Sequence, residues 1–205
     1  MLERAWLSKR QEIALRELVR IGTQAGIHWL KSLAGDGLRG TVKKPSFDPL
    51  STLPGRIGGD TIADLIALDQ SFDGPVSGTY SLLLTQDTAT VLVRSTLIAQ
   101  GIHENHLEEM RQDILLEVGN VILNSCVSSL ADALKLELDS KTPWVRPSAE
   151  HLLSSTGDDT ELLSAHAEIH TPYSQLRADA IFVLDLMPTP KLKKLLDATD
   201  TPIQT

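Results

Sequence analysis

An internal repeat of about 100 residues constrains the fold of this sequence more than any other feature. Apolar periodicity and turn residues predict a long helix, a hairpin and a shorter helix in the first half, over about 7–34, 64–85 and 86–98. The second half repeats this order over about 105–136, 161–186 and 190–198. At a constant shift of 100, the halves align Leu15 with Leu115, Glu17 with Glu117 and Ala67 with Ala167. The chain therefore consists of one unit that occurs twice.

A unit of one long helix and one hairpin cannot cover both faces of its own sheet, so two such units are expected to share a core. We predict an α+β fold, with one domain over 1–205 made of related halves at about 7–98 and 105–198. The strands are expected to form one antiparallel sheet about a pseudo-twofold axis, with the two long helices packed on one side. The stretches 147–155 and 157–159 contain turn-forming residues and are expected to be loops.

Composition excludes several classes of partner. There are 19 Lys and Arg against 27 Asp and Glu, and the net charge of −8 argues against a nucleic-acid partner. The residues Lys191, Lys193 and Lys194 cluster near the end of the chain and are expected to form a solvated helix face. No run of about 18 apolar residues and no signal peptide occur, which predicts no membrane insertion and a cytoplasmic location. The single cysteine, Cys126, excludes an internal disulfide and fits a buried position.

The second long helix carries a stripe of polar residues. Four of them follow at spacings of four, three and four, which places them on one side of a helix: Asp113, Glu117, Asn120 and Asn124. The side expected to face inward is apolar and includes Ile114, Val118, Val121 and Ile122. Gly119 weakens the helix and indicates a place where another surface comes close. Taken alone, Glu-x-x-Asn is typical of any exposed helix face.

Two pairs of histidines are the other candidates for a site. His103 and His106 are spaced like a two-residue metal clip, but no further Cys or His follows at ligand spacing, which favours surface or capping roles. His166 and His170 lie four apart on a predicted strand and face the same side, as surface or half-buried residues often do. We predict no metal site.

The wider pattern around the polar stripe is Asp113-x3-Glu117-x2-Asn120-x22-Pro143. In this duplicated framework it resembles the signature of the CheC, CheX and FliY family of chemotaxis phosphatases. The resemblance implies that Glu117 and Asn120 are catalytic and that Asp113, Asn124 and Pro143 support them. It implies hydrolysis of the aspartyl phosphate of a CheY-like response regulator. It also implies no cofactor of the chain's own, Mg²⁺ on the partner receiver domain, and CheD as a further candidate partner.

The first half departs from this signature. Glu17 matches the required Glu, but Arg20 stands in the place of the Asn and Ile13 in the place of the Asp or Ser. Pro45 lies 25 residues beyond Arg20, whereas Pro143 lies 23 residues beyond Asn120. We therefore predict one working site, in the second half. In the first, Arg20 is expected to contact Glu17 across one helical turn.

Two alternatives to a phosphatase remain. The first is a non-catalytic interaction module, either a flagellar-switch component related to FliM and FliY or a scaffold that binds CheD. The second is a sensory module that has the fold without the activity. A switch component usually carries extra terminal segments, and this chain is little more than the duplicated core, which favours the phosphatase.

Overall fold

The computed structural model describes residues 7–35, 37–156, 161–171, 177–186 and 189–199. The first half contains α1 (Lys9–Ala34), β1 (Arg39–Val42), β2 (Ser46–Pro49), β3 (Ile66–Asp73), β4 (Gly78–Leu84) and α2 (Gln86–Ala99). The second contains α3 (Leu107–Leu134), β5 (Asp139–Ser140), β6 (Trp144–Arg146), α4 (His151–Thr156), β7 (Glu161–His170), β8 (Arg177–Leu186) and α5 (Pro190–Ala198). The predicted α+β class is confirmed.

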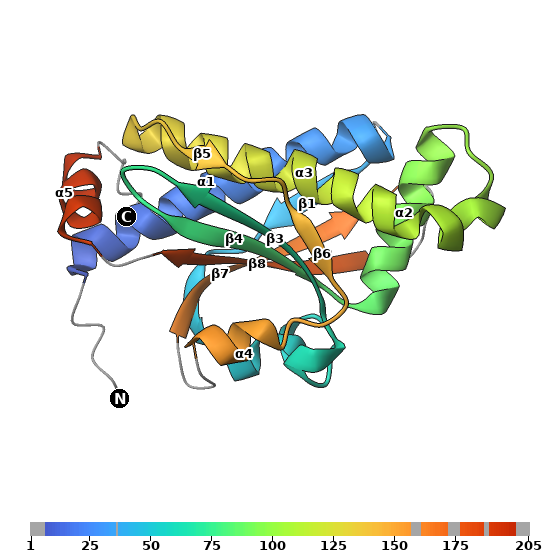
Figure 1. Ribbon diagram of the computed structural model, residues 1–205, viewed down its shortest axis with the longest axis horizontal. Helices are drawn as coiled ribbons and strands as arrows, with labels where there is room; N and C mark the ends of the chain where they lie inside the picture. The colour runs from blue at the N-terminus through green and yellow to red at the C-terminus, as the bar shows by residue number, and fades with distance from the viewer. Residues whose placement is uncertain (1–6, 36, 157–160, 172–176, 187–188, 200–205) are drawn as a thin grey trace.

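All strands belong to one antiparallel sheet, in the order β1-β7-β8-β4-β3-β5, with β2 paired to β7 and β6 paired to β3. The sheet curls, and α1 and α3 lie side by side over one face, as we predicted (Figure 1). Short 3₁₀ helices over 50–64 and α4 contribute apolar side chains to a smaller core on the other face. The catalytic candidates on α3 are thus carried by a helix with a sheet beneath it.

The pairing of β4 with β8 marks the centre of the repeat. Leu82 lies opposite Phe182, so at this point each strand meets its own counterpart at a shift of 100. The constant shift is wrong for β7, however. Ala67 pairs with Leu83 and Ser164 with Val183, which makes Ser164, rather than Ala167, the counterpart of Ala67. The shift there is 97, whereas it is 100 between β4 and β8.

Two glycines let the long helices approach each other closely. A Cβ on Gly22 would lie 3.1 Å from the carbonyl oxygen of Cys126, and a Cβ on Gly26 would lie 2.8 Å from that of Ile122. The helices are antiparallel, since residue numbers rise along one as they fall along the other. Cys126 is buried, as we predicted, and its Sγ donates to the carbonyl of Gly22 at 3.3 Å. Burial raises the pKa of this thiol, which keeps it protonated.

Capping residues recognisable in the sequence define both ends of α1 and the start of α2. Ser8 forms a capping box with Gln11, and the Thr85 side chain accepts from the backbone of Thr88 to begin α2. Gly35 closes α1 with a φ of 95°. The second long helix starts at Leu107 after a 3₁₀ turn, not at Asn105, and it ends before Lys135, whose φ is 54°.

Our prediction of loops over 147–155 is wrong in part, because α4 begins at His151. This six-residue helix is too short to show a helical period, and it forms because Leu152 packs beneath the sheet. The sequence also did not reveal β1, β2, β5 and β6, which have two to four residues each. Such short edge strands contain too few residues for an alternating pattern.

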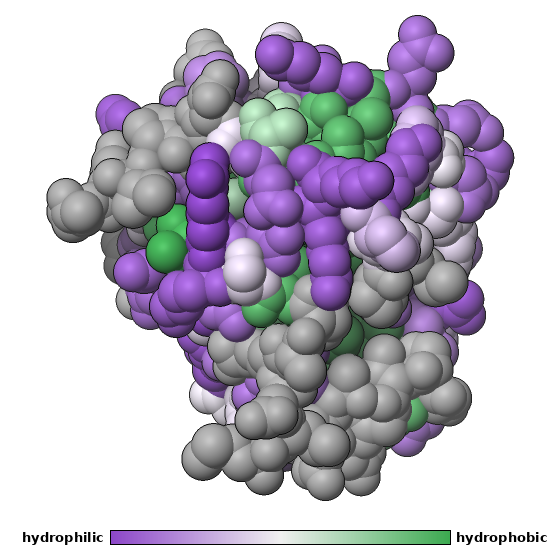
Figure 2. Space-filling view, turned by 90° about the vertical axis from the view of Figure 1, so that its left-hand side faces the viewer, coloured by the Kyte–Doolittle hydropathy of each residue, from purple (hydrophilic) through white to green (hydrophobic). Residues whose placement is uncertain are grey.

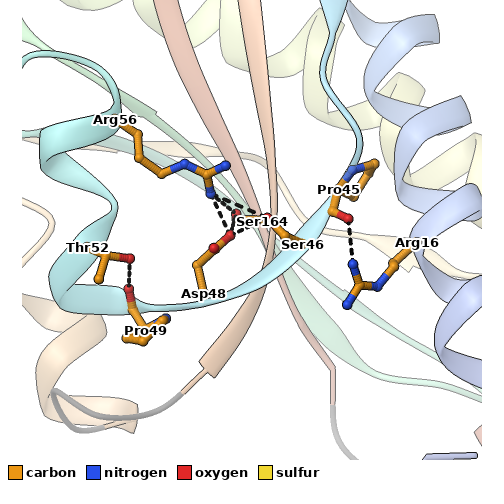
Figure 3. Close-up of polar contacts among 8 residues, drawn as sticks. All are labelled: Arg16, Pro45, Ser46, Asp48, Pro49, Thr52, Arg56 and Ser164. Carbon is orange, nitrogen blue, oxygen red and sulfur yellow. Dashed lines mark hydrogen bonds and ion pairs between the residues drawn. The ribbon is translucent and has the colours of Figure 1, made fainter. Parts of the chain in front are cut away.

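Two polar clusters attach the edge strands to the sheet on the face opposite the long helices. In the first half, the Asp48 carboxylate accepts from Ser46 at 2.6 Å and from Ser164 at 2.5 Å, and it pairs with Arg56 at 2.5 Å (Figure 3). Burial alone would raise the pKa of Asp48, but these hydrogen bonds and the Arg56 charge outweigh it and lower the pKa.

A second cluster, around Asp69 on β3, attaches elements of the second half to the sheet. The Asp69 side chain, 1% exposed, accepts from Ser81 at 2.6 Å and contacts Arg146 at 3.1 Å and His151 at 2.9 Å. Arg146 lies on β6 and His151 on α4, so this one carboxylate holds both elements against the sheet.

The C-terminal helix α5 packs across the start of α1 at one end of the molecule (Figure 1). The Gln11 side chain donates to the Asp197 carboxylate at 3.0 Å. Lys191 and Lys194 are exposed, in accord with a solvated face, and the described surface at this end is largely hydrophilic (Figure 2).

Among the described residues, α3 alone is long and apolar enough to cross a membrane, judged by length and composition. Half of its most apolar 18-residue window is buried inside the fold. The core helix of a water-soluble protein has the same character, so the helix is weak evidence for a membrane span.

Candidate active site on the second long helix

The polar stripe of α3 faces outward. Asp113, Glu117 and Asn120 are exposed, while Ile114, Val118 and Ile122 on the other side of the helix are 0–2% exposed. Val121 is half-buried rather than inward-facing as we expected. The stripe therefore forms where the sequence placed it, and the sheet beneath α3 holds the helix from behind.

Gly119 does mark a close approach, and the approaching surface is the protein's own sheet. The residue is buried, and a Cβ there would lie 2.9 Å from Cδ2 of Leu68 on β3. This glycine sets how near the candidate site sits to the sheet.

Asn120 is connected to the sheet through two further amides. The Asn124 side chain donates from Nδ2 to Oδ1 of Asn120 at 2.7 Å. Gln70 on β3 in turn donates from Nε2 to Oδ1 of Asn124 at 2.7 Å and to the carbonyl oxygen of Lys141 at 2.8 Å. Asn124 is thus half-buried, unlike the other members of the stripe.

Glu117 and Asp113 have no hydrogen bond or ion pair with any residue that the structure describes, so both carboxylates face solvent. Glu117 lies one turn from Asn120, at the i, i+3 spacing that puts two side chains on the same side of a helix. Pro143 is buried in the segment between β5 and β6, which runs beside α3 (Figure 1). The structure therefore brings Asn120, Asn124 and this segment together, and leaves Glu117 available to a partner.

The corresponding face of α1 is chemically different. Arg20 binds Glu17 with two contacts, Nε to Oε2 at 2.8 Å and Nη2 to Oε1 at 2.5 Å, which confirms the expected pair. The hydrogen bond from Arg20 lowers the pKa of Glu17, and the same bond raises the pKa of Arg20. Of the two glutamates at the matching position, Glu17 is therefore ion-paired with Arg20, whereas Glu117 has no partner among the described residues.

The α1 face also exposes apolar side chains. Of the four exposed large hydrophobic residues in the described part of the chain, three lie on α1: Ile13 at 36%, Ile21 at 42% and Trp29 at 57%. Their counterparts at a shift of 100 are Asp113, Val121 and Ser129. The two faces thus offer different surfaces to partners.

The histidine pairs do not form a site. The ring of His103 contacts the Asn105 side chain and that of His106 contacts Glu109, both at the surface. His166 is 5% exposed, more buried than we expected, and lies 2.7 Å from the Asp179 carboxylate. Within the described ranges, no three His, Cys, Asp or Glu side chains gather closely enough to hold a metal ion.

Gln70 is the site residue that the sequence did not bring to our attention. It is 1% exposed and points toward α3 in the same register as Leu68 and Phe72. A polar residue among apolar neighbours on a core-facing register is the signal that would have identified it. Its Oε1 has no partner within the described residues, at a cost of roughly 1–3 kcal/mol.

No protein-family model matches the chain, and no curated protein matches it. Solved structures do. FliY from Thermotoga maritima superposes with a TM-score of 0.67 at 14% identity, over 93% of this chain and 96% of that one. The FliM middle domain from H. pylori gives 0.61 at 13% identity, over 93% and 99%.

A chain in the CheX–CheY–BeF₃–Mg²⁺ complex from Borrelia burgdorferi gives 0.55 at 14% identity, over 83% of this chain and 98% of that one. This protein has the CheC-like fold. Similarity at this identity defines the fold, which both a CheX protein and a FliM domain share. The CheC-like fold explains the duplicated architecture of the chain, and its function depends on the residues that the two helix faces display.

Proposed function

We propose that this protein is a phosphatase that hydrolyses the aspartyl phosphate of a CheY-like response regulator, with one working site on α3. The observation that carries the proposal is the contrast between the two faces. Glu117 and Asn120 stand exposed one turn apart, whereas Glu17 is occupied by Arg20. Fold similarity to a chain in a complex of CheX with CheY supports a receiver domain as the partner.

Hydrolysis of an aspartyl phosphate requires few catalytic groups from the phosphatase. Phosphoryl transfer depends chiefly on positioning and on charge stabilisation, so a small side chain that aims a water at phosphorus supplies most of what is missing. Asn120 suits that role, because a side-chain amide both donates and accepts hydrogen bonds and does not titrate. Glu117 offers a carboxylate to a lysine of the receiver and so sets the position in which the two proteins dock.

The other parts belong to the partner or support the site. The receiver carries the Mg²⁺ that neutralises phosphate charge, and the phosphatase contributes no cofactor. Asp113 adds negative charge to the docking face one turn before Glu117. Pro143 restricts the backbone of the segment beside α3. We place the reaction in the cytoplasm, where a receiver and its phosphatase meet.

A second candidate function is a non-catalytic interaction module. It rests on the exposed apolar side chains Ile13, Ile21 and Trp29, which are spread along α1 at intervals of eight residues, where the matching positions of α3 are Asp113, Val121 and Ser129. In this alternative the chain is a flagellar-switch component related to FliM and FliY, or a scaffold that binds CheD. A contact surface on α1 would involve a different helix from the site proposed on α3.

The test is a phosphate-decay assay in which the purified protein is mixed with phosphorylated receivers from the same genome. We expect the wild type to accelerate phosphate loss, Asn120→Ala to abolish the acceleration while retaining receiver binding, and Glu117→Lys to weaken both. Arg20→Ala, at the matching position of the first half, is the control and should leave the rate unchanged. Equal acceleration by the wild type and Asn120→Ala would refute the assignment.

A further inference from the structure

A chain of three side-chain amides runs from the sheet to the outer surface of α3. It begins at the carbonyl oxygen of Lys141, passes through Gln70 and Asn124, and ends at Asn120. Its hydrogen bonds are 2.8, 2.7 and 2.7 Å long. Gln70 is 1% exposed, Asn124 half-buried and Asn120 exposed, so the chain leads from the core to solvent.

The direction of every bond in this chain follows from its first member. A backbone carbonyl only accepts hydrogen bonds, so Gln70 must turn its nitrogen toward Lys141. That nitrogen also donates to Oδ1 of Asn124, which leaves the nitrogen of Asn124 to donate to Oδ1 of Asn120. The nitrogen of Asn120 is thereby turned away from Asn124.

We propose that Gln70 and Asn124 are positioning residues that orient the amide of Asn120, with the Lys141 carbonyl as the fixed reference. This proposal rests on the proposed phosphatase function and adds to it a reason for the orientation of the catalytic amide. An isolated Asn on a helix surface rotates and flips freely. Here the amide is held with Oδ1 inward and its two N–H groups directed at whatever docks on α3.

The face of α1 provides an internal comparison, because the matching positions there hold no such chain of amides. The hairpin registers make Ala167 the counterpart of Gln70, since Gln70 pairs with Tyr80 and Ala167 with Ala180. Gln24 replaces Asn124 and makes only a 3.5 Å contact with the Gly40 carbonyl. Among the described residues, no buried glutamine therefore lies beneath α1, the helix in which Arg20 stands at the position of the catalytic Asn.

Gln70 occupies a position in the core where an apolar residue would be expected. Its neighbours in the same register, Leu68 and Phe72, are 0% exposed and belong to the main core. A leucine or methionine would fill the same position without leaving an acceptor unpaired. What the amide adds is the donor that its Nε2 offers to Asn124 and to the Lys141 carbonyl.

Two near-isosteric variants test the proposal with the full-length protein. Gln70→Met removes both donated bonds. Asn124→Asp still accepts from Gln70 but cannot donate to Asn120. For both we expect kcat for receiver dephosphorylation to fall about tenfold or more, with the Kd for the receiver within twofold of wild type. Gln24→Ala is the matched control in the first half, and its kcat should equal that of wild type.

A second measurement does not depend on activity. In ¹H–¹⁵N spectra, with the side-chain amide signals assigned from Asn120→Asp and Asn124→Asp, we expect Gln70→Met to shift the amide signals of both residues. An unchanged Asn120 signal, or an unchanged kcat in a folded Gln70→Met protein, would overturn the positioning role of Gln70 while leaving the phosphatase proposal intact. If the wild type does not accelerate phosphate loss, the phosphatase proposal is refuted, and the spectra alone decide whether the chain of amides orients Asn120.

Discussion

The close packing of α1 against α3 predicts that a methyl group added where the two helices cross destabilises the fold. In Gly26→Ala the new Cβ would lie 2.8 Å from the Ile122 carbonyl oxygen and 3.0 Å from Ile122 Cγ2. The first of these atoms is backbone, so one helix must move by a few tenths of an ångström. Overpacking of this kind costs about 1–3 kcal/mol. Alanine recovers about 1 kcal/mol of helix propensity.

The expected net loss is therefore about 0–2 kcal/mol and is centred near 1 kcal/mol, which corresponds to a Tm lower by roughly 2–4 °C for a chain of this size. Urea unfolding followed by circular dichroism measures the change in free energy, and Gly55→Ala is the matched control. A Cβ on Gly55 meets nothing within 4 Å, so that variant should be neutral or slightly more stable. A Gly26→Ala protein as stable as the wild type would refute the close packing of the two helices.

Two further predictions concern the first half. Arg20→Asn releases Glu17 but should not create a second site, because Ala167 and Gln24 provide no amide chain; a decay rate near twice that of wild type would contradict this. Asp48→Asn should destabilise the fold by about 1–2 kcal/mol at neutral pH, through weakened bonds to Ser164 and Arg56. Because the folded pKa of Asp48 is lowered, its stabilisation is present above the unfolded pKa of about 3.9 and is lost as pH falls through the folded value. Urea unfolding from pH 7 down to pH 3 should show the wild type and variant converging, and a constant difference would contradict the assignment.

The long elements were predictable because their patterns are local. α1 and α3 span seven turns or more, and their apolar periodicity identifies both the helices and their buried sides. The hairpins follow from turn residues between apolar runs. By contrast, β5 has two residues and α4 has six, and both form only because the sheet and the second core are already in place. These elements depend on tertiary contacts, so no local sequence pattern predicts them.

The site divides in the same way. The outward placement of Glu117 and Asn120 depends on helix spacing alone, and the structure agrees with it. The role of Gln70 depends on a contact with Asn124 across 54 residues and on a register that places Gln70 under α3. Our alignment at a constant shift also concealed its counterpart, because β7 follows β3 at 97 residues and not at 100.

The duplication places a glutamate at the same position of both long helices, yet Glu17 is ion-paired and Glu117 is not, within the part of the chain that the structure describes. Glu17 and Glu117 occupy matching positions on matching helices, so their spacing along the helix does not distinguish them. What differs is the residue one turn away. Arg20 folds back on Glu17 and neutralises it, whereas Asn120 is held by Asn124 and leaves Glu117 free.

Because a partly exposed i, i+3 ion pair contributes only a few tenths of a kcal/mol, the exchange of Asn for Arg costs the fold almost nothing. The first face thus lacks the polar stripe at little cost to the fold, and it carries Ile13, Ile21 and Trp29 on its surface. Under the proposed function catalysis uses only the second face, so the first is available to a partner that binds apolar side chains.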